Sequence, residues 1–377
     1  MKTIHVGLIG LGTVGSGVVR ILQEHHDDFA RDQDIDLQLV AVASRNDDQA
    51  VQLGIRDIFS FDATDVINNP DVDIVIELIG GTTFARDFVV AALNAGKSVV
   101  TANKALIAAC GREILQLAAD KGVELAFEAS VGGGIPIIGP LRHTLAGNRI
   151  LSIIGIVNGT TNYMLTRMAA DALDYDVVLK EAQGKGFAEA NPAADVEGLD
   201  AAAKIAILSS IAYNTDLKLE DVSVEGITKV APLDLKHADE MGYAIKLLAI
   251  GNRTPEGIDL RVHPTMVPKA HPLASVNGVM NAVYVVGDAV GETMFYGAGA
   301  GSGPAASSVV GDLIEVARHL AYREIITQPI WDTEDLPVRP IDSLVTSYYL
   351  RLPVVDKPGV LARTAQLFAD NDVSIYS

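Results

Sequence analysis

A chain of 377 residues with 49% hydrophobic side chains is long enough for two or three domains and can bury a sizeable core, which excludes a largely disordered protein. Its formal net charge of −19 argues against nucleic acid or an anionic membrane surface as a partner, and no uninterrupted apolar stretch is long enough to span a bilayer. Cys110 is the single cysteine, so no disulfide can form within the chain and a reducing, cytoplasmic location is expected.

The first 131 residues alternate between short strands rich in β-branched residues and amphipathic or apolar helices. This order predicts a dinucleotide-binding α/β domain with a doubly wound parallel sheet. The expected strands span residues 4–10, 37–44, 73–80, 98–103 and 123–131. The expected helices span residues 14–22, 88–96 and 104–122.

From residue 132 to about 300 the pattern changes to that of a second, α+β domain. A strand leading through a loop into a helix is predicted at 150–165. Further strands are predicted at 222–230, 258–267 and 281–290. Further helices are predicted at about 199–212, 236–250 and 305–322.

The C-terminal part divides into three segments. A helix within 301–331 follows a glycine loop and is expected to return to the first domain. Residues 332–347 begin with a stretch rich in Asp, Glu and Pro and are predicted to be a linker. Residues 348–377 read as strand, turn, helix and the start of a strand, which is too short for a compact unit.

The glycine-rich stretch GLGTVG ends the first strand and opens the first helix. In that context the G-x-G-x-x-G spacing is typical of a dinucleotide-binding turn, with the helix N-terminus facing the pyrophosphate. We expect the cofactor to contact Gly10, Gly12, Thr13, Val14 and Gly15. The alternative is a glycine-rich turn with a structural role alone.

Ser44 and Arg45 follow the second strand, where an enzyme that uses NAD normally has Asp or Glu for the ribose diol. A hydroxyl group and a guanidinium group suit a 2′-phosphate, so the sequence favours NADP(H) over NAD(H). The alternative is that Arg45 is a solvated surface residue.

Lys104, in TANKALIA, stands at the carboxyl end of a predicted strand, where doubly wound sheets bind ligands. A lysine at a helix start opposes the helix dipole, which favours a functional role over that of a solvated lysine. Cys110 lies inside the following helix and is interpreted as a packing residue. The histidines show no metal-ligand spacing and are interpreted as structural or solvated.

Glu128 leads into a flexible glycine run in FEASVGGGIP. Such a run can direct several backbone carbonyl groups to one hard cation. On the residues alone, a glycine hinge between domains is the more favoured interpretation.

Asp200 and Lys204 are four residues apart in the apolar run EGLDAAAKIAIL, after an acidic loop that holds Glu189, Asp195 and Glu197. The spacing puts both side chains on one face of a helix. An ordinary helical salt bridge is one interpretation. The other interpretation is a pair that lines a substrate pocket. It is suggested because a helix that is apolar all round is usually buried, and a buried lysine is costly unless it is paired.

Six motifs in this order resemble those of the homoserine dehydrogenase family over about residues 1–325. They are GLIGLGTVG, TANKALIA, GGGIPII, VNGTTNYML, GFAEANPAADVEGLDAAAK and GAGAGSGPAASSVVGDL. The segment from 348, particularly VVDKPGVLA, resembles the opening of an ACT domain. Because that segment stops before such a domain is complete, we expect no inhibition by threonine at millimolar concentration.

The resemblance implies reduction of L-aspartate 4-semialdehyde to L-homoserine with NAD(P)H, on the route to threonine and methionine, by a homodimer built through the second domain. It implies that Lys204 is the acid–base residue, that Glu189, Asp195 and Asp200 bind the substrate, and that Lys104 lies beside substrate and cofactor. It also implies cofactor contacts at Gly186 and Gly301, and a monovalent cation, sodium, at Glu128, Val131, Gly133 and Ile135.

Two rival functions stay open. Aspartate-semialdehyde dehydrogenase shares the substrate, but that reaction needs a cysteine nucleophile, and Cys110 lies in no such setting. A non-catalytic sensor of NADP and an amino acid would suit the ACT-like tail, but it has no need of the Asp200–Lys204 pair. An assay with homoserine and NADP⁺ separates them.

Overall fold

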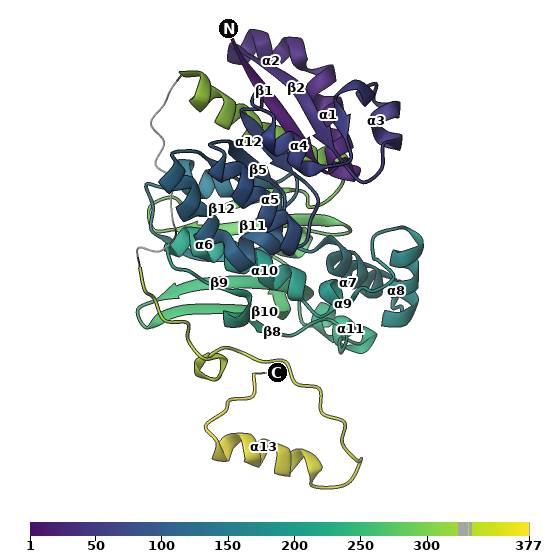
Figure 1. The fold of residues 1–377 in the computed structure, drawn as a ribbon. Helices are drawn as coiled ribbons and strands as arrows, with labels where there is room; N and C mark the ends of the chain where they lie inside the picture. The colour runs from purple at the N-terminus through teal and green to yellow at the C-terminus, as the bar shows by residue number, and fades with distance from the viewer. Residues whose placement is uncertain (323–330, 332–333, 377) are drawn as a thin grey trace. The chain divides into compact units, whose positions relative to one another are not determined.

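The computed structural model describes residues 1–322, 331 and 334–376. The chain forms two units, one over Met1–Leu344 and a smaller one from Val345 onward, and each is described by itself. Within the described residues, the first unit contains two six-stranded sheets (Figure 1). No helix in this described part is both long enough and apolar enough to cross a membrane.

The first sheet is parallel throughout, with the strand order β3-β2-β1-β4-β5-β6 of a dinucleotide-binding fold. The predicted doubly wound α/β sheet is therefore confirmed. Its strands are β1 (Lys2–Ile9), β2 (Ile35–Ala43), β3 (Phe59–Ser60), β4 (Ile74–Glu77), β5 (Ser98–Thr101) and β6 (Leu125–Ala126). The helices that follow them are α1 (Thr13–Glu24), α2 (His26–Gln33), α3 (Asp48–Gln52), α4 (Ala63–Asn68), α5 (Thr83–Asn94) and α6 (Lys104–Lys121).

Helices cover both faces of this sheet. Val6 and Leu8 of β1 pack in one core with α1 and with α12 (Ser302–Tyr322), a helix from the far end of the unit. Ile9 belongs to the core on the opposite face, with α4, α5 and α6. The helix expected within 301–331 thus runs beside α1 over residues 302–322, and residues 323–330 lie outside the described part.

The second sheet has the order β12-β11-β7-β9-β10-β8 and is antiparallel except between β10 and β8. Its strands are β7 (Ile150–Ile156), β8 (Ser223–Val224), β9 (Tyr243–Thr254), β10 (Gly257–Pro268), β11 (Met280–Gly287) and β12 (Gly291–Ala298). The helices of this part are α7 (Gly159–Asp171), α8 (Tyr175–Gly184), α9 (Ala193–Val196), α10 (Leu199–Tyr213) and α11 (Pro232–Glu240). Helices α7, α10 and α11 contact the sheet.

The predicted helix at 236–250 is wrong in its second half, because α11 ends at Glu240 and β9 begins at Tyr243. Leu247 and Ala249 of β9 belong to the core that includes α10, whereas Leu248 and Ile250 belong to a smaller cluster on the other face. A strand buried on both faces is apolar throughout, so its sequence lacks the alternation that identifies a half-buried strand.

Two predicted strands are much shorter than expected. The one at 222–230 is reduced to β8. The N–H group of Glu225 still donates to Val262 of β10, but that of Ile227 donates to the carbonyl of Val196, so the chain has left β10 by then. The one at 123–131 is reduced to β6, because a single helical turn, η2 (Glu128–Ser130), follows at once. Several elements were not anticipated: strands β3 and β12 and helices α2, α3, α4, α8 and α9.

Residues 334–339, within the predicted linker at 332–347, are bonded to the second sheet. The N–H group of Ile258 donates to the carbonyl of Pro337, and that of Arg339 donates to the carbonyl of Ile258, both at 2.9 Å. In the smaller unit, helix α13 (Val360–Asp370) forms where a helix is expected. Neither expected strand is formed among residues 345–376, since none of them has a strand neighbour there.

Candidate active site

The turn after β1 is shaped for a close backbone approach. Gly10 has φ +104°, and a Cβ there would lie 2.7 Å from the carbonyl carbon of Leu78. A Cβ on Gly15 would overlap the carbonyl oxygen of Gly10, so α1 can begin here only with glycine at both positions. Gly12, the N-cap of α1, has nothing within 4 Å of a Cβ position, so the space beside the helix N-terminus is open. The turn fits a dinucleotide pyrophosphate.

Thr13 and Val14 open α1 beside this turn, and the Thr13 carbonyl accepts a hydrogen bond from the Ser302 hydroxyl at 2.7 Å. Gly301 stands directly before Ser302, so the two glycine loops lie next to each other. The GLGTVG turn and the loop at Gly301, two segments predicted to contact the cofactor, therefore meet at the N-termini of α1 and α12.

Ser44 and Arg45 follow the carboxyl end of β2. Ser44 is half-buried, and its N–H group donates to the carbonyl of Ser60 at 3.2 Å. Arg45 is exposed, and it forms no hydrogen bond or ion pair with any residue that the structure describes. Its guanidinium is available to an anionic ligand.

Glu77, at the carboxyl end of β4, is a buried acid that the sequence analysis missed. It is 0% exposed, and its carboxylate accepts the Thr101 hydroxyl at 2.7 Å and the N–H of Ile79 at 2.8 Å. These bonds fix the ends of β4 and β5 next to the glycine turn. A lone acid at the end of the apolar run DIVIELIG was the available signal.

Lys104 is the first residue of α6, after the N-cap Asn103. The Asn103 side chain accepts a hydrogen bond from the N–H of Leu106 and donates one to the carbonyl of Gly81, so the helix start is held firmly. From this position the ammonium group of Lys104 forms an ion pair with Oδ1 of Asp200 in α10. The first sheet and the second structural part therefore meet at a charged contact.

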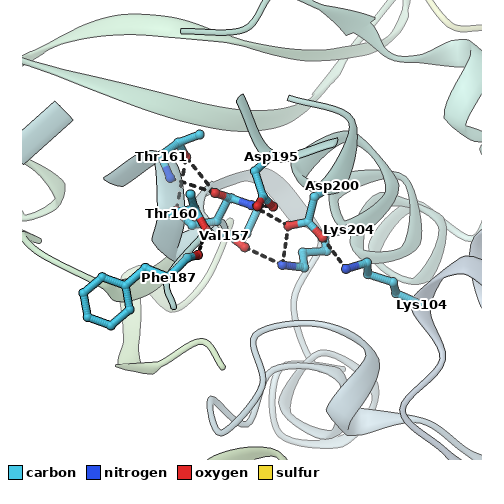
Figure 2. A network of polar contacts seen from close by, with 9 residues as sticks. Lys104, Val157, Thr160, Thr161, Phe187, Asp195, Asp200 and Lys204 are labelled. Atoms are coloured by element: carbon cyan, nitrogen blue, oxygen red, sulfur yellow. Dashed lines mark hydrogen bonds and ion pairs between the residues drawn. The ribbon is translucent and has the colours of Figure 1, made fainter. Parts of the chain in front are cut away.

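Asp200 is the centre of a polar network at the start of α10 (Figure 2). It is 7% exposed, and the Lys204 ammonium lies 2.6 Å from its Oδ2 and 2.6 Å from the carbonyl oxygen of Val157. Burial alone would raise the pKa of Asp200, but Lys204 and Lys104 together hold the pKa of this carboxyl well below its usual range. The carboxylate is therefore charged, and it fixes two cations side by side.

Asn158 connects this network to Asp195, and the sequence analysis did not single it out. Its amide Nδ2 donates to Oδ1 of Asp195 at 2.7 Å and to Oδ2 of Asp200 at 2.9 Å. Its Oδ1 accepts the N–H of Thr161 as the N-cap of α7. The signal was an asparagine before Gly-Thr-Thr, since asparagine is a preferred N-cap residue.

Glu189 and Gly186 lie in the exposed loop between α8 and α9, outside the hydrogen-bonded network. The Thr160 hydroxyl donates to the carbonyl of Phe187 at 2.6 Å and ties this loop to the start of α7 (Figure 2). The Glu189 carboxylate forms no hydrogen bond or ion pair with the described residues. It is therefore free to meet a ligand.

The Glu128 carboxylate is already occupied by the protein backbone. Its oxygens accept the N–H groups of Ile137, Ile138 and Gly139 at 2.5–2.7 Å. No group of three or more His, Cys, Asp or Glu side chains that could hold a metal occurs in the described part of the chain. A cation here would thus need backbone oxygens, and that of Gly133 already accepts the Ser308 hydroxyl at 2.7 Å.

Comparison with known proteins gives a consistent result over the whole chain. The family model described as homoserine dehydrogenase matches residues 136–314, and the one for the NAD-binding domain of homoserine dehydrogenase matches residues 10–128. A homoserine dehydrogenase of Pseudomonas aeruginosa is 45% identical, with 100% of this chain and 88% of that protein covered.

Two solved structures bear on the fold and the cofactor. That of a homoserine dehydrogenase from Thiobacillus denitrificans has a TM-score of 0.96 and 46% identity, covering 100% of this chain and 88% of that one. A hyperthermophilic archaeal homoserine dehydrogenase in complex with NADPH has a TM-score of 0.71 and 26% identity, covering 84% of this chain and 98% of that one.

Proposed function

Because the chain belongs to the homoserine dehydrogenase family, we propose that it interconverts L-homoserine and L-aspartate 4-semialdehyde with NADP(H), using Lys204 as the acid–base residue. The observation that carries this proposal is the buried Asp200 carboxylate paired with both Lys204 and Lys104. We assign the cofactor to residues 1–131 with the helix in 301–331, and the substrate to residues 132–300.

The nicotinamide cofactor, when bound, supplies the hydride acceptor for oxidation and the hydride donor for reduction. Lys204 takes the proton that the homoserine hydroxyl loses, and in the reverse direction it gives that proton to the oxygen on which negative charge develops. A lysine ammonium has three N–H donors, and those of Lys204 that point to Val157 and Asp200 leave one for this oxygen.

Acidic side chains hold the amino group of the substrate in this proposal. Both oxygens of Asp200 already have lysine partners. Among the described residues, Asp195 has a partner on Oδ1 alone, and the Glu189 carboxylate has none. Glu189 and Asp195 therefore make direct contact with the substrate ammonium, while Asp200 mainly orients the lysines. Lys104, between the two structural parts, lies beside both substrate and cofactor.

A steady-state assay tests this proposal and its rivals together. We expect saturable oxidation of L-homoserine with NADP⁺, followed by the absorbance of the reduced nicotinamide. A chain that binds NADPH and amino acid without turnover would be a sensor. Turnover of aspartate 4-semialdehyde that needs phosphate and Cys110 would identify aspartate-semialdehyde dehydrogenase instead.

The preference for NADP(H) rests on Arg45, which is exposed and unpaired among the described residues, next to Ser44. NADPH in the archaeal homologue gives independent support. We expect Arg45→Ala to raise KM for NADP⁺ by about 10-fold, because the free energy of one charge-assisted hydrogen bond corresponds to a change in affinity of about that size. KM for NAD⁺ should stay nearly unchanged. Arg31→Ala, which removes an exposed arginine already paired with Asp28 and Asp32, is the control. Preference of the parent chain for NAD⁺ would refute the assignment.

We further propose that sodium is bound by backbone carbonyl oxygens of Glu128, Val131, Gly133 and Ile135, with the Glu128 carboxylate fixing the turn and supplying nearby negative charge. Sodium chloride should then raise the melting temperature in a saturable manner relative to choline chloride at equal ionic strength. Identical melting curves in the two salts would contradict a cation at this turn.

We also propose a cytoplasmic homodimer built through residues 132–300, acting in threonine and methionine synthesis. Exposed apolar side chains on the edge strand β12, Met294 and Tyr296, support pairing of two copies. The single cysteine supports a reducing compartment. A monomer in sedimentation at micromolar concentration would contradict the dimer.

A further inference from the structure

Trp331 is buried against the middle of α6. It is 5% exposed, and a Cβ on Gly111 would lie 2.5 Å from its Cζ2 atom. Its ring also meets Phe127 edge to face, with centroids 5.8 Å apart. Gly111 is seven residues, about two helical turns, after Lys104. The tryptophan therefore rests on the backbone of the helix that carries Lys104.

Glu334, three positions further along the chain, is bonded to the end of α10. Its N–H group donates to the carbonyl of Asn214 at 3.0 Å, and its own carbonyl accepts the Thr215 hydroxyl at 2.9 Å. Its carboxylate pairs with Arg253 of β9 at 2.6 Å. Asn214 is the C-cap of α10, the helix that carries Asp200 and Lys204.

Helices α6 and α10 are not packed tightly along their whole length. A pocket of about 190 Å³ opens between them, and its lining includes Cys110 and Gly111 of α6, Ser210 of α10, and Trp331. Direct packing alone thus leaves some freedom in the spacing of the two helices. Trp331 on one helix and Glu334 on the other are joined by a short piece of chain.

We propose that Trp331 and Glu334 are positioning residues, a strap that fixes α6 against α10 and so sets where Lys104 stands relative to Asp200 and Lys204. The ion pair between Lys104 and Asp200 joins the first turns of the two helices, and the strap joins the middle of α6 to the C-terminal end of α10. Two separate links prevent one helix from pivoting on the other. The inference rests on the proposed roles of Lys104 and Lys204.

The first test removes two of the bonds that hold Glu334, those to Thr215 and to Arg253, without touching the charged network. Thr215→Val deletes the hydroxyl that reaches the Glu334 carbonyl, and Glu334→Ala deletes the pair with Arg253. We expect the double variant to lower kcat for homoserine oxidation by about 10-fold, because small displacements of catalytic groups are costly. The dissociation constant for NADP⁺ should stay within twofold of the parent value, as a rough bound.

Arg339→Ala is the matched control. It removes an ion pair with Asp259 of β10 at 2.9 Å, from the same docked segment but away from α6 and α10. It should leave kcat unchanged even if it lowers the melting temperature. An equal loss of kcat in Arg339→Ala and in the strap variant would mean that general loosening, and not the strap, causes the effect.

A double-mutant cycle with Lys104→Met gives the decisive readout. If the strap acts through the position of Lys104, Thr215→Val with Glu334→Ala should have no further effect on kcat once Lys104 is gone. The same fold loss in both backgrounds would overturn the proposal. If Lys104→Met alone leaves kcat at the parent value, the proposed role of Lys104 fails and the strap proposal fails with it.

Fluorescence tests the strap independently of activity, because Trp331 is the only tryptophan of the chain. Acrylamide should quench its emission more strongly in the Thr215→Val, Glu334→Ala variant than in the parent or in Arg339→Ala. Unchanged quenching would show that Trp331 and Glu334 do not move as one unit, and would overturn the proposal even in a preparation without turnover.

Discussion

Replacing Lys204 by Met lowers kcat for homoserine oxidation by at least about 10²-fold, the lower range for loss of a general acid–base group. The physical reason is that no second group can take up the hydroxyl proton from the same place, since Lys104 points to the other oxygen of Asp200. NADPH binding should be nearly intact, because Lys204 lies in the second structural part. Folding should be nearly intact as well, because Asp200 keeps its ion pair with Lys104 and Met fills a volume similar to that of Lys. Turnover, NADPH titration and thermal melting on one preparation measure all three.

Lys97→Met is the matched control for this variant. Lys97 is also a buried lysine, 7% exposed, but it donates only to the carbonyls of Asn69 and Val72 and lies at the amino end of β5, away from the ligand edge. Its loss should affect melting and leave kcat close to that of the parent chain. If Lys204→Met instead turns over at the parent rate but melts far lower, the Asp200–Lys204 pair is a structural salt bridge.

The strands of the first sheet other than β3 could be predicted, because they are short and because glycine or the start of a helix follows most of them. GLGTVG between β1 and α1 and the glycine stop after α6 set boundaries that propensity alone would blur. The second sheet was harder. Strand β9 is buried on both faces, and its apolar run cannot be distinguished from that of a buried helix by periodicity.

The charged centre of the site could be predicted because a lysine inside an otherwise apolar helix is costly unless it has a partner. The sequence correctly indicated that Asp200 and Lys204 share one helix face, and the structure adds Lys104 to the same carboxylate. Their chemical roles stay predictions. Glu189 lies in an exposed loop apart from this network, which spacing along the chain cannot reveal.

The residues that sequence reasoning missed are those whose partners come from distant segments. Asn158 bonds to Asp195 and Asp200, which are 37 and 42 residues away, and Glu77 bonds to Thr101 on a neighbouring strand. Glu128 was expected at a cation site, but its carboxylate accepts hydrogen bonds from three backbone N–H groups. Long-range pairs of this kind leave no periodic pattern in one sequence.

Replacing Asp200 by Asn destabilises the fold by about 3 kcal/mol at neutral pH, at the lower end of the cost of breaking a buried ion pair. The Lys204 side chain is only 11% exposed, and the substitution leaves it without a counter-charge. The Lys104 side chain is 44% exposed, so solvent screens its charge when the Asp200 carboxylate is removed. Turnover should fall as well, because both lysines lose the group that orients them. Asp195→Asn is the control for stability alone, since Asp195 accepts a hydrogen bond from Asn158 but forms no ion pair with a described residue.

The same variant has a distinctive dependence on pH. The pKa of Asp200 is lower in the folded chain than in the unfolded chain, so its charge stabilises the fold fully above about pH 4, the ordinary range of an aspartate. That stabilisation is lost as the pH falls toward the folded pKa, because the unfolded chain takes up the proton first. The difference in melting temperature between parent and Asp200→Asn should therefore be constant from pH 7 to about 5 and shrink below about pH 4. A difference that is absent at pH 7, or that grows on acidification, would mean that the two lysines do not stabilise the charged form of Asp200, and the network would lose its role in holding Lys204 for catalysis.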